Sequence, residues 1–347
     1  MAIVSAGRSI EQAGRIQSFR AAFAHPGSAA VIGAVGVFVF FAAQSGPFRS
    51  AAGISNWLDP ASLFGISSIA VALLMIGGEF DLSAGVMTAS TGLVAGLVGT
   101  QTGLNIWFDL LIALVFAVAV GTLNGLIVVS TSLPSFIVTL GTFLSLQGLN
   151  LGVTKLVVNQ VYAGGLDQIH GYSSAHKVFA STINFAGGQF PISVVWWIGL
   201  IIFGAWLLGY TRFGNWVFSV GGNPTAARSV GVPTKRTKIM LFIGTALSGW
   251  LIGTIEAMRL AAVQATQGVG NELIFIVAAV IGGCLLTGGH GSVIGAALGA
   301  LIFGMTQQGI VYLNWNSDWF FLFLGALLLA AALLNHFVRR YAMEARL

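Results

Sequence analysis

Long apolar stretches separated by short polar ones repeat along most of this chain. A helix needs about 20 apolar residues to cross ~30 Å of hydrocarbon, and stretches of about that length occur ten times. They predict transmembrane helices at 28–46, 61–78, 83–101, 108–129, 135–153, 192–210, 238–257, 273–287, 292–312 and 318–335. The eighth range is short, so a partly re-entrant segment is an alternative there. The pattern therefore predicts an all-α polytopic membrane protein with about ten transmembrane helices.

Two tracts without any Asp, Glu, Lys or Arg support this count. They run over residues 110–154 and 273–317, and each is too long for a single helix. Each is also interrupted by residues that favour turns, "STSLPS" at 130–135 and "TGGHGS" at 287–292. Each tract therefore predicts a helical hairpin.

Composition agrees with a surface that faces lipid. Charged residues make up 7% of the 347 residues, whereas an ordinary soluble domain carries roughly 25%. The net charge of +5 forms no dense patch except near residue 228, so we expect no nucleic-acid partner. One cysteine excludes an internal disulfide, and the five His and one Cys show no metal-ligand spacing. We therefore expect no metal site.

Basic residues predict the orientation, because Lys and Arg concentrate on the cytoplasmic side of membrane proteins. With ten spans and both termini in the cytoplasm, that side holds Arg8, Arg15, Arg20, Arg212, Arg228, Lys235, Arg236, Lys238, Arg339, Arg340 and Arg346. The expected organisation is a cytoplasmic segment 1–27, a membrane domain 28–335 and a cytoplasmic tail 336–347. Within the membrane domain, 211–237 is a cytoplasmic loop and 154–191 an outer loop.

The cytoplasmic loop contains signals for a short helix outside the membrane, Pro224 to Val230. Asn223 can cap its N-terminus, Pro224 suits its first position and Gly231 suits the residue after its end. So short a helix must pack on something, since isolated helices under ~12 residues are marginal in water. Ala226 and Ala227 give this helix a smooth face, and Arg228 adds one guanidinium group to it. Such a face is suited to a groove on a partner protein. An ordinary basic loop with a turn is the alternative.

Polar residues inside apolar spans are candidates for lining a translocation path, because intramembrane polarity usually faces a cavity or another helix. The candidates are Asn124, Thr139, Thr142, Gln147, Asn150, Gln307 and Gln308. Each can equally bond a neighbouring helix. Asp81 is predicted to cap the third span, since carboxylates favour helix N-termini.

Several motifs resemble one family of transporters, the permeases of ribose-type ABC importers. "YTRFGNWVFSVGGNPTAARSVGVPTKRTK" (210–238) is similar to their cytoplasmic coupling loop, and the match rests on Gly222, Asn223, Ala226, Ala227, Arg228 and Gly231. "GGEFDLSAG" (77–85) is similar to their G-G-(I/F)-D-L-S-x-G turn through Gly78, Asp81 and Ser83, with Glu79 where a second Gly is common. "GTLNG" (121–125), "LPSFIVTLGT" (133–142), "GNEL" (270–273) and "LTGGHGSVIGAALGAL" (286–301) follow in the family's order.

The resemblance implies a permease subunit in a bacterial inner membrane, with residues 224–230 docked on a cytoplasmic ABC ATPase. It implies a monosaccharide or related polyol as cargo, a periplasmic sugar-binding protein and a second permease chain, most simply a homodimer. The chain is then no enzyme and needs no cofactor. It has no G-x-x-x-x-G-K-(S/T) motif, so ATP is expected to be used by the partner subunit.

Two alternative transporters stay open from the sequence, besides a non-transporting membrane scaffold, against which the polar residues inside the spans weigh weakly. One is a branched-chain amino-acid permease of the same wider family. The other is an ion-coupled secondary transporter, which usually has ionisable residues or broken helices at mid-membrane. The acidic residues lie near the ends of the predicted spans, and this argues against the second alternative.

Overall fold

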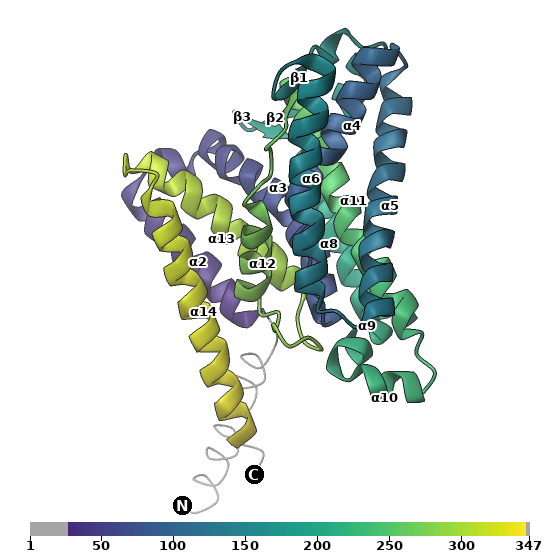
Figure 1. Ribbon diagram of the computed structural model, residues 1–347. Helices are drawn as coiled ribbons and strands as arrows, with labels where there is room; N and C mark the ends of the chain where they lie inside the picture. The colour runs from purple at the N-terminus through teal and green to yellow at the C-terminus, as the bar shows by residue number, and fades with distance from the viewer. Residues whose placement is uncertain (1–26, 345–347) are drawn as a thin grey trace, which may run out of the picture.

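The computed structural model describes residues 27–344 and consists mostly of α-helices (Figure 1). The segment 1–27 and the end of the tail, which we expect in the cytoplasm, lie almost wholly outside the described residues. The longer helices are α2 (Ser28–Gln44), α3 (Ala51–Ile76), α4 (Val86–Thr102), α5 (Ile106–Thr131), α6 (Ser135–Val158), α8 (Ser193–Tyr210), α9 (Arg212–Gly222), α11 (Thr234–Leu260), α12 (Asn271–Ile281), α13 (Val293–Tyr312) and α14 (Trp319–Glu344). The shorter ones are α7 (Tyr172–Phe179), α10 (Pro224–Ser229) and the 3-10 turns η1 (Pro47–Arg49) and η2 (Leu166–Gln168).

Every predicted span overlaps one of these helices, and six helices in the described part are long and apolar enough to cross a membrane. They are α3, α5, α6, α8, α11 and α13. Shorter apolar runs occur in α2, α12 and α14. The multi-pass membrane character is therefore shown, whereas the count of about ten spans stays a prediction.

The expectation of a purely helical chain is wrong in one respect, because four short strands lie at one end of the molecule (Figure 1). Two antiparallel pairs form, β1 with β4 and β2 with β3. Their bounds are β1 (Tyr162–Gly164), β2 (Thr182–Phe185), β3 (Gly188–Pro191) and β4 (Ala262–Gln264). The loop predicted at 154–191 is thus folded: chain segments that leave the helices pair their exposed N–H and C=O groups with each other.

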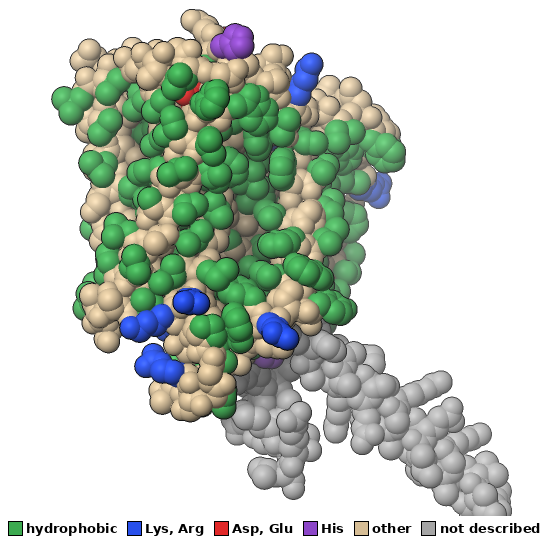
Figure 2. All heavy atoms as spheres, turned by 90° about the vertical axis from the view of Figure 1, so that its right-hand side faces the viewer, with side chains coloured by type: hydrophobic (Ala, Val, Ile, Leu, Met, Phe, Trp, Pro, Cys, Tyr) green, Lys and Arg blue, Asp and Glu red, His purple; other side chains and the backbone are tan. Residues whose placement is uncertain are grey.

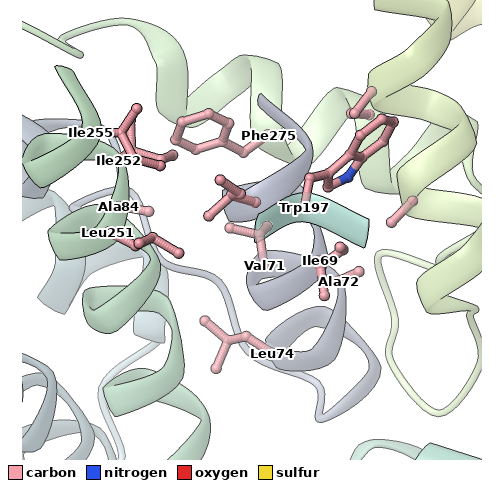
Figure 3. Close-up of a cluster of buried hydrophobic side chains, with 14 of the residues drawn as sticks. Ile69, Val71, Ala72, Leu74, Ala84, Trp197, Leu251, Ile252, Ile255 and Phe275 are labelled. Atoms are coloured by element: carbon pink, nitrogen blue, oxygen red, sulfur yellow. The ribbon is translucent and has the colours of Figure 1, made fainter. Parts of the chain in front are cut away.

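The core is centred on α3, which packs against α8, α11, α12 and α13. Figure 3 shows this cluster around α3, which carries Val71 and Leu74, with Leu251 of α11 on one side and Trp197 of α8 on the other. Leu74 and Phe275 are almost completely buried. Burial of such side chains in a membrane protein yields close packing rather than removal from water, because lipid tails are equally apolar.

Many large hydrophobic side chains point outwards instead. The outer face of α5 exposes Phe108, Leu111 and Val115, and Leu156 of α6 is 84% exposed. Figure 2 shows hydrophobic side chains across the middle of one face, with Lys and Arg gathered mainly at its lower end. This surface suits an apolar belt in hydrocarbon with a basic end in water.

Candidate functional site

The short helix α10 has the caps that its sequence predicts. The Asn223 side chain accepts a hydrogen bond from the Ala226 amide at 3.0 Å, and Pro224 occupies the first helical position. Gly231 follows the helix with a φ of 85°, and its amide donates to the Arg228 carbonyl at 3.0 Å. The helix ends at Ser229, one residue before the predicted end.

The exposed face of α10 is narrower than expected. Ala226 and Arg228 are exposed, whereas Ala227 is buried against the rest of the protein. The pair of alanines therefore does not form one outward face: Ala227 anchors the helix and Ala226 faces out.

The loop that carries α10 contains a second helix, α9, which the sequence reasoning missed. Thr211 caps it by accepting a hydrogen bond from the Gly214 amide at 3.1 Å. Gly214 itself lies against the backbone of Leu207 and Leu208, where a side chain would overlap them. The T-x-x-G pattern at 211–214 was the available signal, since Thr is a common N-cap.

Between α3 and α4, residues 77–85 form a non-helical segment inside the protein, and we call it the buried turn. Its backbone amides are satisfied by side chains of α6: Phe80 donates to Ser135 Oγ and Leu82 to Thr139 Oγ1, both at 3.0 Å. A buried amide without a partner is expensive, and irregular backbone at membrane depth persists only where protein surrounds it. The buried turn is therefore held in a defined shape by the helices around it.

The side chains of the buried turn continue this network. Asp81 accepts hydrogen bonds from the Ser83 hydroxyl at 2.6 Å and from Thr245 of α11 at 2.5 Å. Asn124 of α5 donates to Ser83 Oγ at 3.0 Å and accepts from Thr142 of α6 at 2.6 Å. The prediction that Asp81 caps the third span is wrong, because α4 begins only at Val86 and the carboxylate is used to join the turn to α11.

An ion pair links the same turn to the first turns of α11. Glu79 pairs with Lys238, which lies near the start of α11, and both side chains are mostly buried. In the motif quoted above, Glu79 stands where a second glycine is common. Its negative charge is paired with Lys238.

The predicted path residues do not lie together. Asn124, Thr139 and Thr142 belong to the network of the buried turn, while Gln147 and Asn150 lie further along α6. Gln147 is half-buried, and the Nδ2 amide of the buried Asn150 has no hydrogen-bond partner.

Gln307 lies elsewhere, on α13. It lines a cavity of about 100 Å³ together with Phe64, Glu256, Asn271 and Phe275, and its Oε1 atom has no hydrogen-bond partner.

A further feature is the meeting of α4 and α12 inside the protein. An α12 of 11 residues extends only about 16 Å, half the thickness of the hydrocarbon core. Its N-terminus packs on that of α4, because the carbonyl of Gly268 and the amide of Glu272 lie where a side chain on Gly85 would go. The Glu272 carboxylate accepts a hydrogen bond from the Gly270 amide at 3.0 Å, so it caps α12 where helix N-termini favour negative charge. The shortness of the eighth apolar range was the signal for this arrangement.

Comparison with known proteins identifies the family of the chain. The family model described as "Branched-chain amino acid transport system / permease component" matches residues 53–332. The chain belongs to this family of permeases. The match covers the buried turn, α10, α4 and α12, so these features lie in the shared permease domain.

Individual relatives of this permease carry names of sugar transporters. The chain is 30% identical to the xylose/arabinose import permease protein XylH of Sulfolobus acidocaldarius, covering 88% of this chain and 83% of the relative. It is 32% identical to the ribose import permease protein RbsC of Escherichia coli K12, over 81% and 84% of the two chains. The xylose transport system permease protein XylH of the same organism is 27% identical, over 88% and 90%. No solved structure matches the chain.

Proposed function

We propose that this permease is the membrane-spanning subunit of an ATP-driven importer, and that α10 is the element on which the ATPase subunit docks. The observation that carries the proposal is the geometry of α10: a capped helix outside the apolar belt, anchored by Ala227 and exposing Ala226 and Arg228. In a permease, such a helix can serve as the contact site for a cytoplasmic ATPase subunit.

The charge around α10 specifies the partner surface. Arg212, Arg228, Lys235 and Arg236 are exposed around it, and residues 211–237 contain no acidic residue. A groove lined with Asp or Glu complements such a surface and speeds encounter. Lipid phosphates attract the same charges, which supports a cytoplasmic position for this end of the molecule.

For the cargo we propose a monosaccharide or related polyol. The relatives named above are called ribose, xylose or arabinose permeases, although the family description names branched-chain amino acids. A zwitterionic amino acid favours charged groups along its path, whereas the candidates on α5 and α6 are the uncharged Asn124, Thr142 and Gln147. Only Gln307 shares its cavity with a charged residue, Glu256. The amides and hydroxyls of these candidates suit sugar hydroxyl groups. Branched-chain amino acids are the second candidate cargo, on the strength of the family description.

We further propose a homodimer supplied by a periplasmic sugar-binding protein. The helix α6 is the least buried of the six candidate spans, with 22% of its apolar window inside the protein. It also carries Gln147 on a partly exposed face, and a polar amide turned towards lipid is unfavourable. When a second copy of the chain covers this face of α6, Gln147 lines a polar path between the two copies instead of facing lipid.

The docking test uses purified permease in nanodiscs with the ATPase subunit from the same source. Ala226→Glu adds a negative charge to the exposed face of α10, and Ser173→Glu adds the same charge to an exposed position of α7, at the other end. We expect the α10 variant to weaken ATPase binding by about tenfold or more, since like-charge and steric mismatch at an interface costs over 1 kcal/mol, and the α7 variant to bind as wild type. Equal binding by both variants would contradict docking on α10.

A further inference from the structure

Three glycine pairs from distant parts of the chain meet next to the N-terminus of α10. They are Gly77–Gly78 after α3, Gly221–Gly222 at the end of α9, and Gly288–Gly289 in the connection between α12 and α13. We call this meeting point the glycine junction. Nothing in their sequence spacing predicts that the three pairs come together.

The backbones in the glycine junction touch without side chains between them. The Gly289 amide donates a hydrogen bond to the Ile76 carbonyl at 2.8 Å. A Cβ atom on Gly221 would overlap that same carbonyl and lie 2.6 Å from the Gly289 nitrogen. Real Cβ atoms essentially never approach heavy atoms within 3.0 Å, so only glycine fits there.

The other two contacts are equally close. A Cβ atom on Gly288 would lie 2.7 Å from the Gly78 Cα atom, and one on Gly289 would lie 2.8 Å from the Gly222 Cα atom. Gly78, Gly288 and Gly289 also have positive φ angles of 83°, 79° and 71°, which L side chains rarely adopt. All three segments are thus held in mutual contact by geometry that a larger residue would break.

We propose that the glycine junction transmits the movement of α10 to the two interrupted parts of the membrane domain, the buried turn and the α12–α13 connection, as one rigid unit. The proposal rests on the docking function of α10. It adds the route by which docking reaches the interior, and it makes Gly221, Gly288 and Gly289 positioning residues for transport.

The chain connections make this route short. Gly222 is followed at once by the Asn223 cap of α10, and Gly78 is itself part of the buried turn. The buried turn is in turn bonded to α5, α6 and α11 through Asn124, Thr139 and Thr245. Side chains can absorb a movement by changing rotamer. Because the contacts in the glycine junction are between backbones, a displacement of α10 is passed on directly.

Close packing alone is the competing explanation, because glycines commonly let membrane helices approach. A packing role predicts loss of folding or of assembly when a glycine is replaced. Transmission predicts a different result: an assembled complex in which ATP is no longer coupled to uptake.

The test compares Gly221→Ala with Gly209→Ala, in proteoliposomes with the partner ATPase and binding protein from the same source. Gly209 lies in α8, and a Cβ atom there meets nothing within 4 Å. We expect Gly221→Ala to bind the ATPase as wild type does, while uptake and binding-protein-stimulated ATP hydrolysis fall by about tenfold, within the range for residues that couple two sites. Gly209→Ala should keep both.

Uptake at the wild-type rate by Gly221→Ala would overturn the proposal. Loss of both ATPase binding and uptake would overturn it too, because the defect would then lie in docking. Failure of wild-type permease to bind the ATPase at all would instead refute the docking function.

A second measurement needs no variant, in case Gly221→Ala does not fold. Hydrogen–deuterium exchange of the wild-type complex is followed with and without trapped ATP, in peptides covering 74–80, 219–225 and 285–291. A rigid unit keeps the Gly289 amide bonded to Ile76, so the 285–291 peptide should stay equally protected in both states. Loss of that protection in the ATP state would overturn the proposal.

Discussion

Asp81 carries a carboxylate deep in the protein, and every hydrogen bond it accepts holds the buried turn in place. Its Oδ1 atom accepts from the amide and hydroxyl of Ser83, and its Oδ2 atom from Thr245. Charged groups are costly in such an environment unless they are fully bonded. The residue therefore fixes the local path of the chain, and α11 is its anchor.

Replacement of Asp81 should destabilise the protein measurably. In Asp81→Ala, the Thr245 and Ser83 hydroxyls lose their acceptor, which we expect to lower the free energy of unfolding by about 2 kcal/mol. Asp81→Asn keeps one acceptor oxygen and should lose less. Thermal unfolding in detergent checks this, with Ser90→Ala as the control, because that buried hydroxyl bonds the Val86 carbonyl of its own helix. Equal melting temperatures for Asp81→Ala and the control would contradict this role of the carboxylate.

Cys284 should be unreactive in the folded protein. It lies in the connection after α12 and is almost completely buried. A buried structural cysteine is inert because reagents cannot reach its sulfur atom. We expect a maleimide reagent to label Ala226→Cys, which carries its new thiol on the exposed face of α10, and to label Cys284 only after denaturation. Native labelling of the wild-type chain would show that this connection opens.

At the scale of elements, sequence reasoning succeeded where the chemistry is local. Asn223, Pro224 and Gly231 lie within nine residues and specify α10 without help from the rest of the chain. The buried turn could not be read in this way. Its partners Ser135, Thr139 and Thr245 come from 55, 57 and 164 residues away, and the same residues in isolation look like the start of a helix.

Contacts between residues far apart in the sequence also explain why the strands and the arrangement of the path candidates were not predicted. β1 pairs with β4, whose residues follow about 100 positions later, and no local pattern in either predicts the other. The polar residues of α5 and α6 were recognisable as unusual, but only the fold shows that Asn124 and Thr142 bond each other while Gln307 lines a separate cavity on α13.

The exposed guanidinium of Arg228 should contribute to docking at the element scale. We expect Arg228→Ala to weaken ATPase binding by about tenfold at low salt, and by less at high salt, because surface charge interactions are screened. Lys177→Ala removes a matched exposed cation from α7, at the other end, and should bind as wild type. Salt-independent binding that is unchanged in Arg228→Ala would show that α10 docks through its shape alone.

At the scale of the whole molecule, the protein combines a continuous scaffold with two interruptions that face each other. Helices α3, α5, α11 and α13 are each long and apolar enough to cross a membrane, whereas the N-termini of α4 and α12 meet inside the protein. Ion-coupled transporters also use broken helices and ionisable residues within the membrane, and this chain has the half-buried Glu256 and Arg259. The architecture alone therefore does not choose between energy sources. Membership in the permease family and the capped α10 favour ATP.

Uptake by reconstituted permease decides this most directly. The permease, its ATPase and its binding protein are placed in proteoliposomes, and entry of labelled xylose, ribose and leucine is measured with ATP, with an ion gradient, or with neither. We predict uptake of a sugar that requires ATP and the ATPase and that does not depend on the ion gradient. Uptake driven by the ion gradient without the ATPase would contradict it, and ATP-driven uptake of leucine in place of either sugar would contradict the proposed cargo.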